Sequence, residues 1–197
     1  MHVTDVHGAQ GLLEYAVRQL AKAEKADLVI VSGDLELYSL EWLSETPVPV
    51  LATTGNMDDY HVAAALRVAG VILDGKCVEV QGVRFCGIGG LAVTRDAVSV
   101  LSASKGAMVD VLVSHYPPRG TAVDIAYTGA HIGKEVIKEV LSEVKPKLCL
   151  CGHVHESRGT DRVGETLVVN PGPLMWGYYA VIDLEEVKAD LKQVTKV

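Results

Sequence analysis

Several absences narrow the classes of protein to which this 197-residue chain can belong. No apolar run approaches the roughly 18 uncharged residues that a membrane-spanning helix needs. The N-terminus shows no basic segment followed by an apolar one, so no secretory signal is visible. The 18 Lys and Arg residues are outnumbered by 25 Asp and Glu, giving a net charge of −7. That balance gives no broad electrostatic footprint for nucleic acid or an anionic membrane.

Cysteine is also scarce: the four residues are Cys77, Cys86, Cys149 and Cys151. They lack C-x-x-C spacing and the density of a disulfide scaffold. Cys149 and Cys151 alternate within an apolar run, which puts them on one strand face, where cysteine behaves as a small hydrophobe. We interpret all four as inert core thiols in the reduced state and expect a cytoplasmic protein.

Apolar residues make up 49% of the chain, which excludes intrinsic disorder, and the length fits one domain over residues 1–197. Short apolar runs rich in β-branched residues are typical of strands covered on both faces. They lie at 28–31, 48–52, 109–114, 148–151 and 167–169. Amphipathic helical patterns at 9–24, 59–69 and 133–144 alternate with them, which predicts an α/β fold with parallel strand pairs.

Two segments depart from this alternation and predict β-hairpins. One covers 76–88 with its turn at Gln81-Gly82, and the other covers 178–197 with its turn near Glu185-Glu186. Hairpins pair their strands antiparallel, so we expect mixed sheets. Only four residues precede Asp5, which makes the first strand short and leaves a longer natural N-terminus open.

Five small motifs carry polar side chains to the ends of predicted strands. They are Asp5-Val6-His7, Gly33-Asp34, Gly55-Asn56, His115 and Gly152-His153-Val154-His155. Ligands collect at the carboxyl ends of strands in open α/β sheets, so these side chains should meet at one edge. Two aspartates, one asparagine and four histidines suit Mn, Fe, Zn or Ni better than Ca or Mg. Seven ligands exceed one tetrahedral site and fit two metals that share a bridging carboxylate.

The ordered set D-x-H, G-D, G-N, H and G-H-x-H resembles the calcineurin-like metallophosphoesterase superfamily. Flanking runs at 115–118, 151–157 and 169–172 resemble its small prokaryotic Icc-related phosphoesterases. The resemblance implies an α/β (α+β) fold, a four-layer sandwich of two mixed β-sheets flanked by helices. It also implies the ligand roles: Asp5, His7 and His155 on one metal, Asn56, His115 and His153 on the other, and Asp34 as the bridge. Mn is the favoured metal.

One residue departs from the pattern of the superfamily. Many members carry a histidine after Gly-Asn, where it assists the leaving group, and this chain carries Met57, which cannot donate a proton. We therefore expect hydrolysis of a phosphodiester or an activated phosphomonoester, a nucleotide among the candidates, by metal-bound hydroxide. Asp34, His115 and His153 are the expected catalytic residues. His131 precedes a predicted helix and is a candidate for the missing acid and for substrate binding, against a helix-start or surface role.

The remaining candidates each have a structural alternative. Asn56 and Arg158 are candidate substrate contacts, although a structural salt bridge is the more common role for a residue such as Arg158. Asp58 would support a ligand or orient water, or else act as a helix N-terminal carboxylate. We interpret Trp176 as a core or interface residue, together with Tyr178 and Tyr179, rather than as a base-stacking platform.

Two other functions stay open. The superfamily also includes a non-catalytic member that serves in protein assembly, but it has lost metal ligands that are intact here. A nuclease is less favoured, since the chain has no spare length and no basic surface for gripping strands. We expect a small-molecule substrate, no nucleic-acid or membrane partner, and leave a homodimer open.

Overall fold

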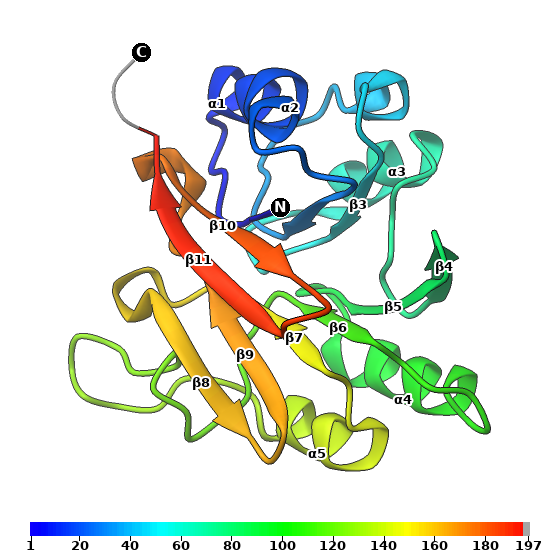
Figure 1. Cartoon of the computed structure of the whole chain (residues 1–197), viewed down its shortest axis with the longest axis vertical. Helices are drawn as coiled ribbons and strands as arrows, with labels where there is room; N and C mark the ends of the chain where they lie inside the picture. The colour runs from blue at the N-terminus through cyan, green and yellow to red at the C-terminus, as the bar shows by residue number, and fades with distance from the viewer. Residues whose placement is uncertain (195–197) are drawn as a thin grey trace.

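The computed structural model, which describes residues 1–194, places two β-sheets face to face with helices on their outer faces (Figure 1). The order of the layers is helices, five-stranded sheet, six-stranded sheet, helices. This arrangement confirms the predicted four-layer sandwich. In the described part of the chain, no helix combines the length and the apolar character needed to cross a membrane.

The first sheet joins the two ends of the chain. Its strands are β1 (His2–Val3), β2 (Val29–Ser32), β3 (Val50–Thr53), β10 (Tyr178–Asp183) and β11 (Lys188–Gln193), in the order β11-β10-β1-β2-β3. The strands β1, β2 and β3 run parallel. The C-terminal hairpin adds antiparallel strands beside β1, so the sheet is mixed as expected.

The second sheet has parallel strands at its centre and an antiparallel strand at each edge. Its strands are β4 (Cys77–Val80), β5 (Val83–Ile88), β6 (Val111–Ser114), β7 (Leu148–Leu150), β8 (Gly159–Val163) and β9 (Thr166–Asn170), in the order β4-β5-β6-β7-β9-β8. Side chains of both sheets, among them Ile30, Val113 and Leu150, fill the space between them. Burial on both faces explains the continuous apolar runs of these strands.

Helices cover the outer faces and bury their apolar stripes there. The first sheet packs against one continuous helix made of α1 (Gln10–Tyr15), η1 (Ala16–Leu20) and α2 (Ala21–Ala23), and against η2 (Glu41–Glu45) and α3 (Tyr60–Val68). The second sheet packs against α4 (Val93–Ala103) and α5 (Glu135–Val144). Two short helical turns lie between strands: η3 (His155–Ser157) follows β7, and η4 (Leu174–Trp176) follows β9.

One α-helix and one strand, α4 and β8, were not predicted, and each lacks a clear sequence pattern for a local reason. The buried face of α4 contains the carboxylate of Asp96, which accepts a hydrogen bond from the Gly89 backbone and interrupts the apolar stripe. The edge strand β8 has a largely polar sequence and relies on its pairing with β9. The predicted hairpin at 178–197 is present through Gln193, and residues 195–197 lie outside the described part of the chain.

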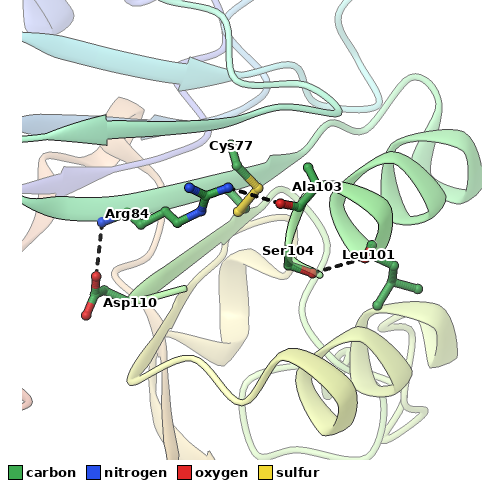
Figure 2. Close-up of a disulfide and its surroundings, with 7 residues drawn as sticks. Cys77, Arg84, Leu101, Ala103, Ser104 and Asp110 are labelled. Carbon is green, nitrogen blue, oxygen red and sulfur yellow. Dashed lines mark hydrogen bonds between the residues drawn. A yellow bond between two sulfur atoms is a disulfide. The ribbon is translucent and has the colours of Figure 1, made fainter. Parts of the chain in front are cut away.

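The expectation of four reduced cysteines is wrong for one pair. Cys77 and Cys86 lie opposite each other on β4 and β5, with Cα atoms 4.0 Å apart, and form a disulfide (Figure 2). Their pairing follows from the Gln81-Gly82 turn, because every residue pair placed symmetrically about a two-residue turn comes face to face. Cys149 and Cys151 are free and buried, as expected for core thiols.

Candidate metal centre

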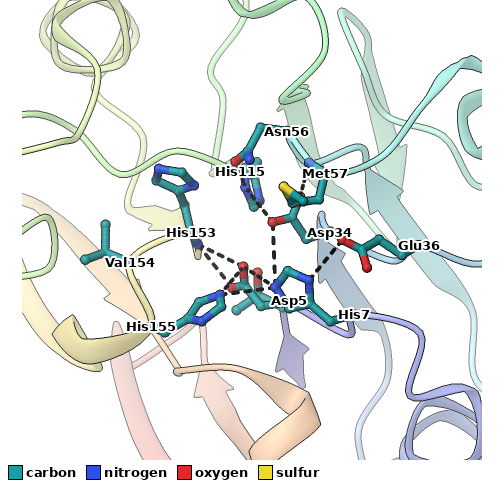
Figure 3. A network of polar contacts seen from close by, with 12 residues as sticks. Asp5, His7, Asp34, Glu36, Asn56, Met57, His115, His153, Val154 and His155 are labelled. Carbon is teal, nitrogen blue, oxygen red and sulfur yellow. Dashed lines mark hydrogen bonds and ion pairs between the residues drawn. The ribbon is translucent and has the colours of Figure 1, made fainter. Parts of the chain in front are cut away.

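The predicted ligands meet where the two sheets present the carboxyl ends of their parallel strands. Asp5, Asp34 and Asn56 follow β1, β2 and β3 of the first sheet. His115 and His153 follow β6 and β7 of the second. Figure 3 shows these side chains converging from both sheets, with His7 and His155 beside Asp5. Adjacent parallel strands end at one edge of a sheet, which is why residues scattered over 150 positions of sequence come together.

The first group of converging ligands is Asp5, His7 and His155. The Nε2 atoms of His7 and His155 are 3.2 Å apart. Asp5 Oδ1 lies 3.3 Å from His155 Nε2 and 3.9 Å from His7 Nε2. Two imidazole nitrogens and a carboxylate oxygen that face a common point form a donor set suited to a transition-metal ion.

The second group contains Asn56, Asp34 and His115. His115 Nε2 lies 2.9 Å from Asn56 Oδ1 and 3.5 Å from Asp34 Oδ2. The same Asp34 oxygen lies 3.8 Å from His7 Nε2 in the first group. One carboxylate oxygen therefore stands between the two groups of donors.

His153 reaches the site through both its backbone and its ring. Its backbone N–H donates to Asp5 Oδ2 at 3.1 Å. Its imidazole stands edge-on to that of His115, with ring centroids 5.2 Å apart, on the His115 side of the cluster (Figure 3). The ring is thus a neighbour of the second group, although its nitrogens are not among the most tightly converging atoms.

Contacts behind the ligands orient two of the imidazoles. His7 Nδ1 lies 3.2 Å from Glu36 Oε1, and His115 Nδ1 lies 2.9 Å from the backbone oxygen of Ser32. When Nδ1–H donates to these acceptors, Nε2 is left with its lone pair facing the cluster. The Glu36 carboxylate is a contact that the sequence reasoning missed.

Asp58 joins the loops that carry Asp34 and Asn56. Its two carboxylate oxygens accept from the backbone N–H groups of Glu36 and Gly55, at 2.8 and 2.7 Å. The helix-capping role falls to Asp59 instead, which accepts from the first N–H groups of α3. Burial raises the pKa of Asp58, and its position supports the loops behind the ligands rather than the helix.

The backbone of the site adopts conformations that side chains usually avoid. Asp5, His7, Asp34, Glu36 and His153 have φ angles of 53, 45, 52, 52 and 71°. Non-glycine residues in this left-handed region cost about 1–3 kcal/mol each and persist where the surrounding structure holds them. Such clustering of strain at one place is typical of a functional site.

Two glycines allow neighbouring strand ends to approach closely at the site. A Cβ on Gly55 would collide with the Asp34 side chain, and a Cβ on Gly152 would collide with Thr4 and Asp5. Both positions follow strands whose ends meet in the cluster. Any larger residue at Gly55 or Gly152 would displace Asp34 or Asp5. The G-N and G-H-x-H motifs therefore need glycine at these positions for steric reasons.

Burial and mutual contacts shift the pKa values of the ligands. Burial raises the pKa of Asp5, but the hydrogen bond from His155 and the charge of His115 outweigh it, and the pKa lies below its usual value. Burial raises the pKa of Asp34. Burial and the neighbouring His115 lower the pKa of His153 to about 4, whereas the hydrogen bond to Asp5 raises that of His155. At neutral pH His153 is therefore an uncharged imidazole, the form that binds metals.

Comparison with known proteins identifies the family. A family model described as "Metallophosphoesterase, calcineurin superfamily" matches residues 97–194. An uncharacterized protein of Methanocaldococcus jannaschii, MJ1162, is 31% identical over 90% of this chain and 89% of its own length. The chain belongs to the calcineurin superfamily of metallophosphoesterases. The resemblance carried by the five sequence motifs is thereby confirmed.

Solved structures share the metallophosphoesterase fold. The crystal structure of TT1561 from Thermus thermophilus superposes with a TM-score of 0.75 at 19% identity, over 98% of this chain and 97% of that chain. A structure titled as a novel archaeal phosphodiesterase gives a TM-score of 0.62 at 17% identity, over 98% of both chains. At these identities the similarity concerns the fold.

His131 lies outside the ligand cluster of this metallophosphoesterase, in a loop that borders it. Its Nδ1 is 2.6 Å from Oδ1 of the buried Asp124, and 43% of its side chain is exposed. The same loop contacts η3, where the Tyr127 backbone N–H donates to Glu156 at 2.7 Å. Asp124 fixes the orientation of the ring and leaves Nε2 as its free nitrogen.

Arg158 is occupied by structural contacts. Its Nε donates to the Pro171 backbone oxygen at 2.9 Å, and one Nη donates to the Lys192 backbone oxygen at 3.2 Å. The guanidinium also lies 4.7 Å from the centroid of the Tyr178 ring. These contacts join the loop after β9 to β11 and favour the structural alternative over a contact with substrate phosphate.

Residues beside the cluster also escaped sequence reasoning. Lys134 Nζ lies 4.4 Å from the centroid of the Tyr116 ring, which itself lies 4.4 Å from the ring of His153. This places a cation one aromatic ring away from a predicted ligand. Its only signal in the sequence is a Gly-Lys pair before the helix that follows His131. Trp176, interpreted as a core or interface residue, is 47% exposed and lies against His155.

Proposed function

We propose that the protein is a dinuclear metal-dependent phosphoesterase that hydrolyses a phosphodiester or an activated phosphomonoester. One observation carries the dinuclear part: Asp34 Oδ2 lies 3.8 Å from His7 Nε2 and 3.5 Å from His115 Nε2. A carboxylate between two groups of donors reduces the repulsion between two dications. Membership in the metallophosphoesterase superfamily supports the reaction class.

The donor sets fit two divalent ions, with Mn favoured over Fe, Zn or Ni. Asp5, His7 and His155 would hold one ion, Asn56, His115 and His153 the other, and Asp34 would be shared between them. Ions bound in this way lower the pKa of a coordinated water and neutralise charge on a phosphate. The assignment of His153 rests on its neutral ring and its place beside His115.

The chain's own groups then position the ester and complete the proton transfer. Asn56 is exposed and offers an uncharged amide, so it can contact both an ion and a substrate oxygen. Met57, directly after it, has no proton to give. We assign the acid to His131: Nδ1 stays hydrogen-bonded to Asp124, and a proton on Nε2 passes to the leaving oxygen as the P–O bond breaks.

We propose that residues 1–197 form one domain that acts on a small-molecule ester or nucleotide. The hairpin β10–β11 pairs with β1, which supports this because strands from early and late in the described chain share one sheet. A non-catalytic scaffold of the same fold is the alternative. Metal content separates the two, since a scaffold does not require ions at these ligands.

Hydrolysis of bis(p-nitrophenyl) phosphate with added Mn²⁺ tests the proposal. We expect two ions per chain in the wild type, and loss of both activity and bound metal in Asp34→Ala and His153→Ala. The matched control is Asp27→Ala, which removes an exposed carboxylate that precedes β2, at the opposite end of the strand from Asp34. This variant should keep wild-type rates. Wild-type rates in Asp34→Ala and His153→Ala would contradict the proposal. Fewer than one ion per chain, together with no hydrolysis, would favour the scaffold.

A further inference from the structure

An exposed indole stands at the edge of the candidate metal centre. The Trp176 ring lies edge-on to that of His155, with centroids 5.5 Å apart and an interplanar angle of 82°. Nearly half of the Trp176 side chain, 47%, is open to solvent. Large aromatic side chains are usually covered, so an exposed indole beside a candidate ligand of the centre requires an explanation.

The turn that carries Trp176 is held rigidly to the strand end that carries Asp5. In η4, the backbone N–H groups of Leu174 and Met175 donate to the backbone oxygens of Thr4 and Asp5, at 2.8 and 3.4 Å. Leu174 is completely buried and anchors the turn in the core. The backbone that carries the indole is thus fixed relative to Asp5, which limits the entropy lost when a flat group binds to the ring.

The other tryptophan, Trp42, is an indole with a structural role and serves as a comparison. Trp42 packs against the first core cluster, and its Nε1 donates to the Ser39 backbone oxygen at 3.1 Å. The guanidinium of Arg18 lies 5.3 Å from its ring centroid. The Trp176 ring, by contrast, lies against His155, and the residue is 47% exposed.

A second apolar side chain belongs to the same site. Met57 is 58% exposed, and its backbone N–H donates to Asp34 Oδ1 at 2.8 Å (Figure 3). The ligand cluster therefore has an exposed apolar side chain beside each group of donors, Trp176 at His155 and Met57 at Asp34. A phosphate ester bound between them would meet apolar surface with the organic part of the molecule, as in most small-molecule sites.

We propose that Trp176 determines specificity by stacking a planar aromatic group, a nucleobase or an aryl ring, of the phosphate ester. This inference rests on the proposed function, because it places the phosphate of that ester at the metal centre. Stacking on one aromatic face tolerates any flat ring, since every such ring has a π-face. The substrate class is accordingly a phosphodiester whose retained ester group, the one that stays on phosphorus after hydrolysis, is planar and aromatic.

Two diesters that share the same leaving group isolate the contribution of Trp176 to substrate specificity. Bis(p-nitrophenyl) phosphate and methyl p-nitrophenyl phosphate both release p-nitrophenolate, and they differ in whether the retained group is aromatic. We expect Trp176→Leu to lower the ratio of their kcat/KM values about 10-fold. Trp176→Phe should preserve most of the ratio, and the control Trp42→Phe should leave it unchanged.

A binding measurement provides a readout without turnover. The chain has two tryptophans, so Trp42→Phe leaves Trp176 as the single indole. We expect phenyl phosphate to quench its fluorescence and methyl phosphate to have a much smaller effect. Both ligands carry the same phosphate, so the difference reports contact with the aromatic ring.

The outcomes separate this inference from the proposed function. Equal loss on both diesters with reduced metal content in Trp176→Leu would mean that the indole only positions His155, and would overturn the inference. If Trp176→Leu left the ratio of kcat/KM values unchanged but altered the oligomeric mass, Trp176 would belong to a subunit interface, and the inference would be overturned as well. Failure of the wild type to hydrolyse either diester would overturn the proposed function, whereas selective quenching by phenyl phosphate would still support the aromatic contact.

Discussion

The Nε2 atoms of His7 and His155 lie 3.2 Å apart, although 148 positions separate the two residues in the sequence. His7 follows β1 of one sheet, and His155, the last residue of the G-H-x-H motif after β7 of the other sheet, begins the turn η3. The two sheets must pack in register for these nitrogens to face one another. The ligand cluster is therefore a direct product of the sandwich, and the contacts that orient each imidazole should control metal affinity.

Removal of the Glu36 carboxylate tests this control. Glu36 Oε1 lies 3.2 Å from His7 Nδ1 and holds the ring so that Nε2 faces the cluster. We expect Glu36→Ala to weaken Mn²⁺ binding about 10–100-fold, as for other groups that support a metal-bound histidine. Calorimetric titration measures the affinity, and Glu139→Ala, on the exposed face of α5, is the control. Equal affinities in the two variants would show that Glu36 does not orient the ligand.

The assigned acid should matter in proportion to the basicity of the leaving group. His131→Asn removes the proton on Nε2 while the amide can still contact Asp124. We expect little change for methyl p-nitrophenyl phosphate and a reduction of about 100-fold or more for methyl phenyl phosphate, whose leaving oxygen needs a proton. Rates on the two diesters give the comparison, with His61→Asn, on an exposed position of α3, as the control. The same loss on both diesters would remove His131 from the role of acid.

The buried His2 should make folding sensitive to acid. Its Nε2 lies 2.8 Å from Ser32 Oγ, its Nδ1 is buried with no partner, and burial lowers its pKa from 6.5 to about 3. Between those values the unfolded chain binds a proton that the folded chain does not, so stability falls as the pH falls below 6.5. We expect the wild type to lose about 2 kcal/mol more than His2→Gln between pH 7 and pH 5.

Urea denaturation with a chelator present measures this difference without a contribution from bound metal. The control His61→Gln, at a side chain that is 86% exposed, should follow the wild type. Parallel pH dependence in the wild type and in His2→Gln would show that His2 does not contribute.

The disulfide between Cys77 and Cys86 should stabilise the fold. It closes a loop with a sequence separation of 9, and loop-closure entropy predicts about 2–3 kcal/mol for a crosslink of that length. We expect the free energy of unfolding to fall by this amount when the wild type is treated with a reductant. Cys77→Ala/Cys86→Ala should start from the lower stability and be insensitive to the reductant. A reductant effect on the double variant, or none on the wild type, would contradict this expectation.

The elements that were predicted correctly have a common physical cause. Strands such as β2, β6 and β9 are buried on both faces, so their own residues carry a continuous apolar signal. The helix α5 carries its apolar stripe in the same local way. The edge strand β8 lacks such a signal because one side of it has no partner strand, and α4 loses part of its stripe to the buried Asp96.

The residues of the candidate site also fall into those that local sequence reveals and those that it does not. Seven candidate ligands could be named from the sequence because each occupies a short motif directly after a strand, where the chain must end its ladder and turn. Glu36, Lys134 and Trp176 could not be assigned in this way, since each matters through a partner far away in the sequence or in another element. The sequence offers two alternative roles for Arg158 and two for Asp58, and the hydrogen-bond partners of each side chain in the fold favour one of them.

The sequence by itself determined the α/β class, the order of the motifs and the set of candidate metal ligands, because apolar periodicity and strand-end motifs are local properties of the chain. Only the tertiary structure decided that Cys77 and Cys86 are joined, that Asp34 stands between two groups of donors, and that Trp176 is open to solvent beside His155. Each of these depends on the register of paired strands or on the packing of one sheet against the other. Such distances are set by the whole fold, and no short segment of sequence contains them.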